Sequence, residues 1–176
     1  PPGSSGRPGQ RSEDIRARLN ALSELPDEWE EALTRWRKWH AGCLTDLDGK
    51  SAPSANDRYL LYQTLLGAWP VKPMSADEYR TLRDRIAAYM TKATREAKVY
   101  TSWVNPNEAY DKALQTFIQA ILPDGAATPF LQDLDAFARR LAHGPSVAQV
   151  HAPEIGTATS RSRSRNRHSD EAGTSE

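Results

Sequence analysis

The sequence has a single cysteine, Cys43, among its 176 residues. One thiol cannot close a disulfide within the chain, so a small disulfide-stapled secreted fold is excluded. We therefore expect a reducing, cytoplasmic compartment. A metal site is not expected either, because Cys43 has no partner set and the histidines are scattered in the sequence. These histidines are His40, His143, His151 and His168.

An excess of charge of one sign is also absent, since 23 basic residues balance 23 acidic ones. No overall field therefore favours nucleic acid or an anionic membrane as a partner. Long hydrophobic runs are missing as well. No uninterrupted apolar stretch approaches the roughly 20 residues that span a bilayer, and residues 1–10 lack the apolar segment of a signal peptide. We expect no nucleic-acid partner and no membrane partner.

The two ends of the chain are polar and rich in Gly, Ser, Pro or Arg. This composition predicts disorder in residues 1–10 and in residues 146–176, on either side of an ordered region at 11–145. The Arg/Ser run at 160–168 could bind RNA or phosphates. It lacks interleaved aromatic residues, so we favour a linker or tail without nucleic-acid binding.

The ordered region has the periodicity and the start signals of a mainly α fold with about six helices and no strand beyond short links. A loop rich in Asp, Gly, Ser and Pro is expected over residues 45–55. The predicted helix starts are an N-cap at Ser12, Pro26 in a first turn, a helix from Asp57, a Ser75–Glu78 capping box, the pair Asn105–Pro106 and the pair Thr128–Pro129.

The third predicted helix, residues 57–68, is apolar on nearly every face. A helix of this kind is normally buried among other elements. A small bundle does not easily provide that much cover, so we expect this helix to pack against a larger body. The apolar residues in and next to it are Tyr59, Leu60, Leu61, Tyr62, Leu65, Leu66 and Trp69.

Tryptophan is frequent, with 5 residues, and tryptophan faces can stack on sugar rings. Trp29 and Trp36 lie on one helical stripe, which favours core packing over sugar binding. Trp39 lies beside that stripe and is the more open of the three. The chain contains no Gly-rich phosphate loop and no Gly-x-Ser-x-Gly elbow.

Several segments, in the same order, resemble maltooligosyl trehalose synthase of the α-amylase superfamily. The matches together cover about residues 11–142. They are Arg11–Leu19 (RSEDIRARL), Tyr59–Pro70 (YLLYQTLLGAWP), Tyr89–Lys98 (YMTKATREAK), Thr101–Pro106 (TSWVNP) and Asn107–Tyr110 (NEAY).

The resemblance implies a fold and a reaction. In the full-length family the helical segment packs on a (β/α)8 barrel. The enzyme is an isomerase that changes the reducing-end α-1,4 bond of a maltodextrin into an α,α-1,1 bond, in trehalose biosynthesis. Retaining-glycosidase chemistry explains this step through a carboxylate nucleophile and a carboxylic acid, without any cofactor. The implied partners are a maltooligosaccharide and the missing barrel portion.

The resemblance also implies that this chain contains no catalytic residue. The family nucleophile and acid/base lie upstream of the match. A third carboxylate belongs to a His-Asp-Thr-Lys motif directly before the match, and its aspartate position is Pro8 here, with Gln10 at the lysine position. We therefore expect the isolated chain to be inactive.

The candidate substrate-binding residues are Arg11 and Glu13, which adjoin that motif, and the aromatic residues Tyr62 and Trp103, for which core packing is the competing interpretation. An alternative function remains open, namely a non-enzymatic helical interaction module with a basic, nucleic-acid-binding tail.

Overall fold

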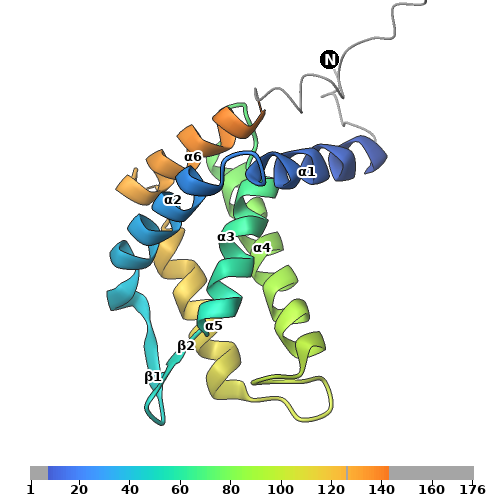
Figure 1. Cartoon of the computed structure of the whole chain (residues 1–176). Helices are drawn as coiled ribbons and strands as arrows, with labels where there is room; N and C mark the ends of the chain where they lie inside the picture. Colours follow the sequence, from blue (N-terminus) through green and yellow to red (C-terminus); the bar gives the residue numbers. More distant parts are fainter. Residues whose placement is uncertain (1–7, 126, 143–176) are drawn as a thin grey trace, which may run out of the picture.

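The computed structural model describes residues 8–125 and 127–142, and it describes side chains from Ile15 onward. This part of the chain forms six α-helices and one β-hairpin (Figure 1). The mainly α fold class is confirmed. The elements are α1 Pro8–Leu22, α2 Pro26–Trp39, the short 3-10 helix η1 Ala41–Cys43, β1 Thr45–Leu47, β2 Lys50–Ala52, α3 Ala55–Ala68, α4 Ala76–Ala97, α5 Glu108–Ile121 and α6 Pro129–Ala142.

Helix α1 begins at Pro8, so the N-cap predicted at Ser12 is wrong. Proline has a backbone angle suited to the first helical position, where its missing N–H costs nothing. Residues 8–10 therefore belong to this helix and not to the predicted disordered end. The disorder predicted for residues 1–7 and 146–176 lies outside the described residues.

The expected loop at 45–55 contains a hairpin that the sequence interpretation missed. β1 and β2 pair antiparallel, with Leu47 opposite Lys50. Asp48 and Gly49, which connect them, have φ angles of 54° and 78°. Two positive φ angles define the tight hairpin turn that favours Asp-Gly. The sequence signal was present, but the strands are only three residues long and lack a clear alternating pattern.

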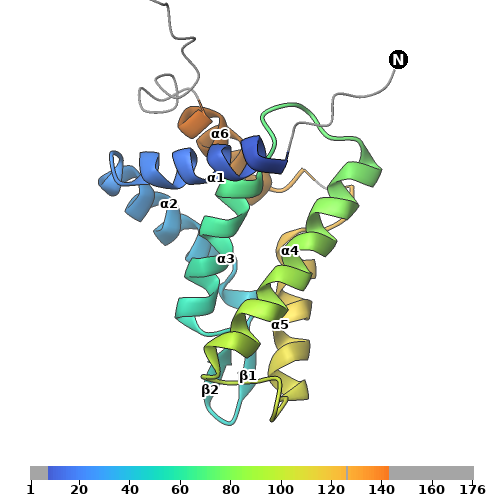
Figure 2. The same cartoon turned by 90° about the vertical axis from the view of Figure 1, so that its right-hand side faces the viewer.

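Helix α3 runs through the middle of the molecule and packs against α1, α4 and α6 (Figures 1 and 2). Every residue from Asp57 to Pro70 is buried or half-buried. The prediction that this helix is buried is confirmed. The expectation that this helix also packs against a larger body stays a prediction, since several of its residues are only half-buried in this chain.

An aromatic core joins α2, α3 and α6. Trp36 is fully buried and meets Tyr62 and Phe130 edge-on, with ring centroids 5.4 and 5.3 Å apart. Trp29 packs against Trp36 at 5.6 Å. The prediction that Trp29 and Trp36 are core residues is confirmed, whereas Trp39 is 42% exposed. Edge-on contacts of this kind add to the free energy gained by burial.

The caps of α4 and α6 follow the sequence signals. The capping box at Ser75 and Glu78 is present, and the Thr128 hydroxyl accepts a hydrogen bond from the Leu131 N–H. The cap of α5 is Asn107, two residues later than predicted, and its side chain accepts from the Tyr110 N–H. None of the helices in the described part of the chain is both long and apolar enough to span a membrane.

Candidate functional site

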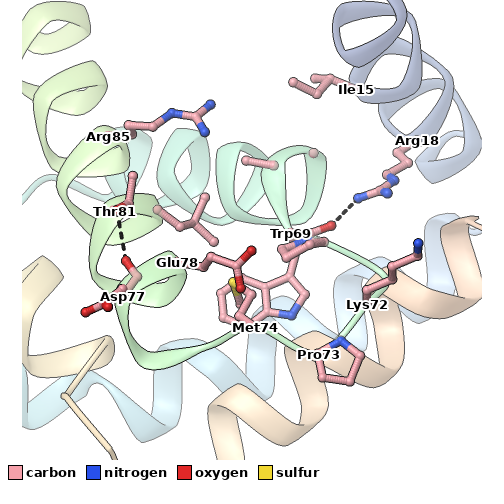
Figure 3. Close-up of a pocket in the computed structure, with 14 residues that line it drawn as sticks. Ile15, Arg18, Trp69, Lys72, Pro73, Met74, Asp77, Glu78, Thr81 and Arg85 are labelled. Atoms are coloured by element: carbon pink, nitrogen blue, oxygen red, sulfur yellow. Dashed lines mark hydrogen bonds between the residues drawn. The ribbon is translucent and has the colours of Figure 1, made fainter. Parts of the chain in front are cut away.

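A cleft lies between α1, the end of α3, the link at 69–75 and the start of α4 (Figure 3). Its volume is about 580 Å³. Ile15 and Arg18 line it from α1, Trp69 and Lys72 from the link, and Arg85 from α4. The cleft therefore gathers residues from segments that are far apart in the sequence.

Two contacts hold α1 against the end of α3 and so shape the cleft. Gly67 lets the helices approach, since a Cβ at this position would lie 3.1 Å from Cγ2 of Ile15. The Arg18 guanidinium donates a hydrogen bond to the carbonyl oxygen of Trp69. The Trp69 indole N–H in turn donates to Asp135 of α6 at 3.2 Å. The link is thus fixed to both α1 and α6.

The carboxylates of the cleft are engaged by neighbouring groups. Glu78 accepts hydrogen bonds from the Ser75 N–H at 2.8 Å and from the Ser75 hydroxyl at 2.9 Å. The backbone hydrogen bond is the larger cause that lowers the pKa of Glu78. Asp77 pairs with Arg80 at 2.5 Å. A carboxyl with a lowered pKa is a poor general acid at neutral pH, so Glu78 is not suited to that role.

Two basic side chains in the cleft remain available. Lys72 and Arg85 lie on different sides of it (Figure 3), and neither has a hydrogen bond or ion pair with another residue that the structure describes. Cations without a partner in the described part of the chain, beside an apolar wall formed by Ile15 and Trp69, can bind acidic or hydroxyl-rich groups. The arrangement is suited to contact with a protein or ligand surface of mixed character.

Arg11 and Glu13 lie within α1, and their side chains are outside the part of the structure that is described. The α4–α5 link, which carries Trp103, is at the opposite end of the molecule from α1 (Figures 1 and 2). The structure therefore does not bring the predicted substrate-binding residues together into one site.

Tyr62 is fully buried in the aromatic core. Its hydroxyl is hydrogen-bonded to Nδ1 of His40 at 2.8 Å. Burial raises the pKa of Tyr62 to about 12. For His40, burial is the larger cause and the nearby charge of Arg58 the smaller one, and together they lower its pKa to about 4. The pair is neutral at pH 7 and has no exposed face, so in this fold Tyr62 packs in the core.

Trp103 has the opposite environment, because its side chain is 56% exposed. It lies in the link between α4 and α5, with the Arg95 guanidinium 4.8 Å from its ring centroid. No ring contact joins Trp103 to Tyr62 among the residues described. An exposed indole with one charged neighbour can contact a ligand or another protein.

The sequence interpretation did not identify Arg18, Trp69, Lys72 or Arg85 as residues of a cleft. The sequence could have identified Arg18, because it lies three positions after Ile15 in the same motif and hence on the same helix face. The others lie in separate segments, and their proximity depends on how α1, α3 and α4 pack. Among residues 15–125 and 127–142, no cluster of three or more His, Cys, Asp or Glu residues could hold a metal ion. The Arg/Ser run lies outside the described residues.

No family model matches the chain. Comparison with curated proteins finds putative maltooligosyl trehalose synthases of two Mycobacterium tuberculosis strains, each 33% identical over 139 residues. The matched region covers 79% of this chain and 16% of each relative. Solved structures agree. A hypothetical maltooligosyl trehalose synthase from Sulfolobus tokodaii is 32% identical over 73% of the chain, with a TM-score of 0.56.

The chain is homologous to one segment of the maltooligosyl trehalose synthases. A second structure named for maltooligosyl trehalose synthase matches with a TM-score of 0.58 at 26% identity, and DSM5389 glycosyltrehalose synthase is 34% identical with a TM-score of 0.55. The chain spans about 16% of the length of the curated maltooligosyl trehalose synthases that it matches. The resemblance first read from the sequence motifs is therefore confirmed.

Proposed function

We propose that this chain acts as one helical segment of a maltooligosyl trehalose synthase. The complete enzyme would be an isomerase of the α-amylase superfamily that changes the reducing-end α-1,4 bond of a maltodextrin into an α,α-1,1 bond. The observation that supports this most is the agreement of both comparisons, at 32–34% identity, with a fold that matches the same enzymes.

Within such an enzyme the segment would position catalytic groups and would not take part in the reaction itself. In the family pattern, the last three positions of the motif with the third catalytic carboxylate correspond to residues 8–10, which are the first residues of α1. The contacts of Ile15 with Gly67 and of Arg18 with Trp69 fix the direction of α1 relative to α3 and α4. A rigid helix next to a catalytic motif holds it in place, and small misplacements of reacting groups are costly in rate.

We further propose that the isolated chain is inactive. Retaining chemistry on a glycoside needs two carboxyl groups about 5 Å apart across the scissile bond. In the family pattern the third carboxylate position is Pro8 here, and the acids of the cleft, Asp77 and Glu78, are engaged by Arg80 and Ser75. Hydrogen bonds from Ser75 lower the pKa of Glu78, whereas a general acid needs a raised one.

The proposed partners are a maltooligosaccharide and a barrel portion of the same enzyme. The basic side chains of Lys72 and Arg85 and the apolar wall of the cleft give a surface of the mixed character found where domains of one chain meet. We propose the cytoplasm as the compartment, in keeping with the free thiol of Cys43.

The proposed lack of activity is tested by incubating the purified chain with maltopentaose and measuring the concentration of reducing ends over time. An intact relative serves as the positive control. The expected result is no loss of reducing ends with the chain and clear loss with the relative. Formation of a trehalosyl product by the chain alone would contradict the proposal. Far-ultraviolet circular dichroism of the same sample verifies that the chain is helical, so that an inactive sample is not an unfolded one.

A further inference from the structure

The link between α4 and α5 carries an unusual group of exposed apolar side chains. Tyr100 is 43% exposed and Trp103 is 56% exposed, while the neighbouring Val99 and Val104 are 70% and 93% exposed. Large apolar side chains gathered on one short segment indicate a contact surface more often than single ones do. The two aromatic rings of this group each pack against a neighbouring side chain, Arg95 for Trp103 and Tyr110 for Tyr100.

Trp103 has a fixed support on one face. The Arg95 guanidinium lies 4.8 Å from the centroid of the ring. Two nitrogens of Arg95 bind the Asp111 carboxylate, Nε at 3.2 Å and Nη2 at 2.8 Å. Asp111 belongs to α5 and Arg95 to α4, so an ion pair between two helices holds the cation beneath the indole. Since Trp103 is more than half exposed, its other face remains open to solvent.

Tyr100 also has one face covered, in its case by a second aromatic ring. Its ring stacks on Tyr110 with centroids 4.9 Å apart and an angle of 12° between the planes. The Tyr110 hydroxyl donates to the Asp57 carboxylate and accepts from the Ser54 N–H at 2.9 Å. Tyr110 is itself buried. The Tyr100 ring therefore has one face covered by a fixed side chain and one face available.

The backbone between the two rings is also constrained. The Asn105 N–H donates to the Ser102 hydroxyl at 2.9 Å, and the Asn107 N–H donates to the Thr101 hydroxyl at 3.0 Å. These bonds close a turn around Trp103. The exposed side-chain amide of Asn105 has no partner among the described residues, so this link also offers free donors and an acceptor.

We propose that Tyr100 and Trp103 form a stacking platform for the glucopyranose rings of an oligosaccharide. A pyranose ring has apolar C–H faces, which match an open aromatic face, and a polar edge, which can bond to polar groups of the same link. Rings that are fixed before binding lose little conformational entropy when a ligand stacks on them. The choice of an α-1,4-glucan as the ligand rests on the proposed function, whereas the platform rests on the contacts at Arg95 and Tyr110.

The platform is tested on the full chain by titrating maltopentaose and following the indole N–H signals by nuclear magnetic resonance. The expected result is a saturating shift of the Trp103 signal within about 20 mM sugar, in the range of a weak single contact. Trp39 is the matched control, since it is an exposed tryptophan of α2 without such a support, and its signal is expected to stay constant.

Trp103→Ala and Trp103→Phe complete the experiment. The alanine variant is expected to fold normally, because the side chain is largely exposed, and to lose the sugar-induced shifts of the link. The phenylalanine variant keeps a stacking face and is expected to retain part of them. Absence of saturable shifts in the wild-type chain, equal shifts with sorbitol, or a Trp103 signal that depends on protein concentration alone would each overturn the platform. Binding and catalysis have separate readouts, so maltopentaose binding without any turnover still supports it.

Discussion

The indole N–H of Trp36 donates a hydrogen bond of 2.7 Å to Oδ2 of Asp133, although the residues are 97 positions apart. The same carboxylate binds the Arg35 guanidinium at 3.0 Å. Trp36 is fully buried, so its donor has little access to water in the folded chain. This part-buried contact joins α2 to α6 at the edge of the aromatic core.

Replacing Asp133 with alanine is expected to lower the free energy of unfolding by about 2 kcal/mol, because it leaves the buried Trp36 donor without a partner. Asp133→Asn keeps an acceptor oxygen and is expected to cost less. Asp84→Ala serves as the control. That carboxylate is exposed, and its ion pair with Arg83 is long, at 3.8 Å, so losing it is expected to cost little. Urea unfolding of the three variants measures the difference, and an equal loss in all of them would contradict the role of the Trp36 bond.

Gly67 is expected to be intolerant of a large side chain. A Cβ there already lies 3.1 Å from Ile15, so Gly67→Leu must push α1 away from α3. Overpacking of this kind costs about 1–3 kcal/mol. The double variant with Ile15→Ala removes the opposing Cγ2 and is expected to recover part of the loss. Thermal unfolding monitored by circular dichroism gives both values, and additive losses in the double variant would show that the contact is not the cause.

The stability of the chain is expected to fall as the pH drops from about 6.5 to about 4. Burial first and Arg58 second lower the pKa of His40 in the folded chain to about 4, below its ordinary value of 6.5. In this window the unfolded chain takes up a proton that the folded chain refuses, so stability is complete above pH 6.5 and is lost toward pH 4. The full loss from this group is about 3 kcal/mol.

His40→Gln is the comparison that isolates this effect, because carboxylates elsewhere also titrate near the lower limit. The variant is expected to show a smaller fall of the free energy of unfolding between pH 6.5 and 4 than the wild-type chain. Equal falls in both would mean that His40 is not the group responsible. The measurement is a series of urea titrations across the pH range.

The hairpin turn is expected to depend on Gly49. Its φ of 78° is unfavourable for residues with a side chain, so Gly49→Ala should cost about 1 kcal/mol. Asp48→Asn is the matched change, because asparagine accepts the φ of 54° at that position and is expected to be nearly neutral. Hydrogen exchange at the Leu47 and Lys50 amides reports the hairpin locally. If hydrogen exchange at these two amides were unchanged in Gly49→Ala, the positive φ at position 49 would not be strained by a side chain.

Local signals predicted much of this fold. The capping box at Ser75 and Glu78 and the cap at Thr128 depend only on residues three positions apart, so they are readable from the sequence. The stripe of Trp29 and Trp36 follows from helical periodicity. The hairpin was missed because its strands have only three residues each, too short for the alternation of a strand to appear.

The candidate site could not be predicted to the same degree. An apolar sequence such as that of α3 shows that it must be buried but does not show what covers it, and here α1, α4 and α6 do so. Tyr62 and Trp103 are both aromatic residues within matched motifs, yet one is fully buried and the other is 56% exposed. Only the packing of the helices separates a core tyrosine from an open tryptophan.

We propose that this chain is a working segment of a maltooligosyl trehalose synthase without a catalytic group of its own. Transplanting residues 15–142 into the Mycobacterium tuberculosis relative, in place of the homologous segment, tests it directly, with trehalosyl product from maltopentaose as the readout. We predict that this chimera is active, and that a second chimera, which begins at Pro8 and so replaces the family aspartate, is folded but inactive. A folded, inactive first chimera, or equal activity in both, would contradict the account.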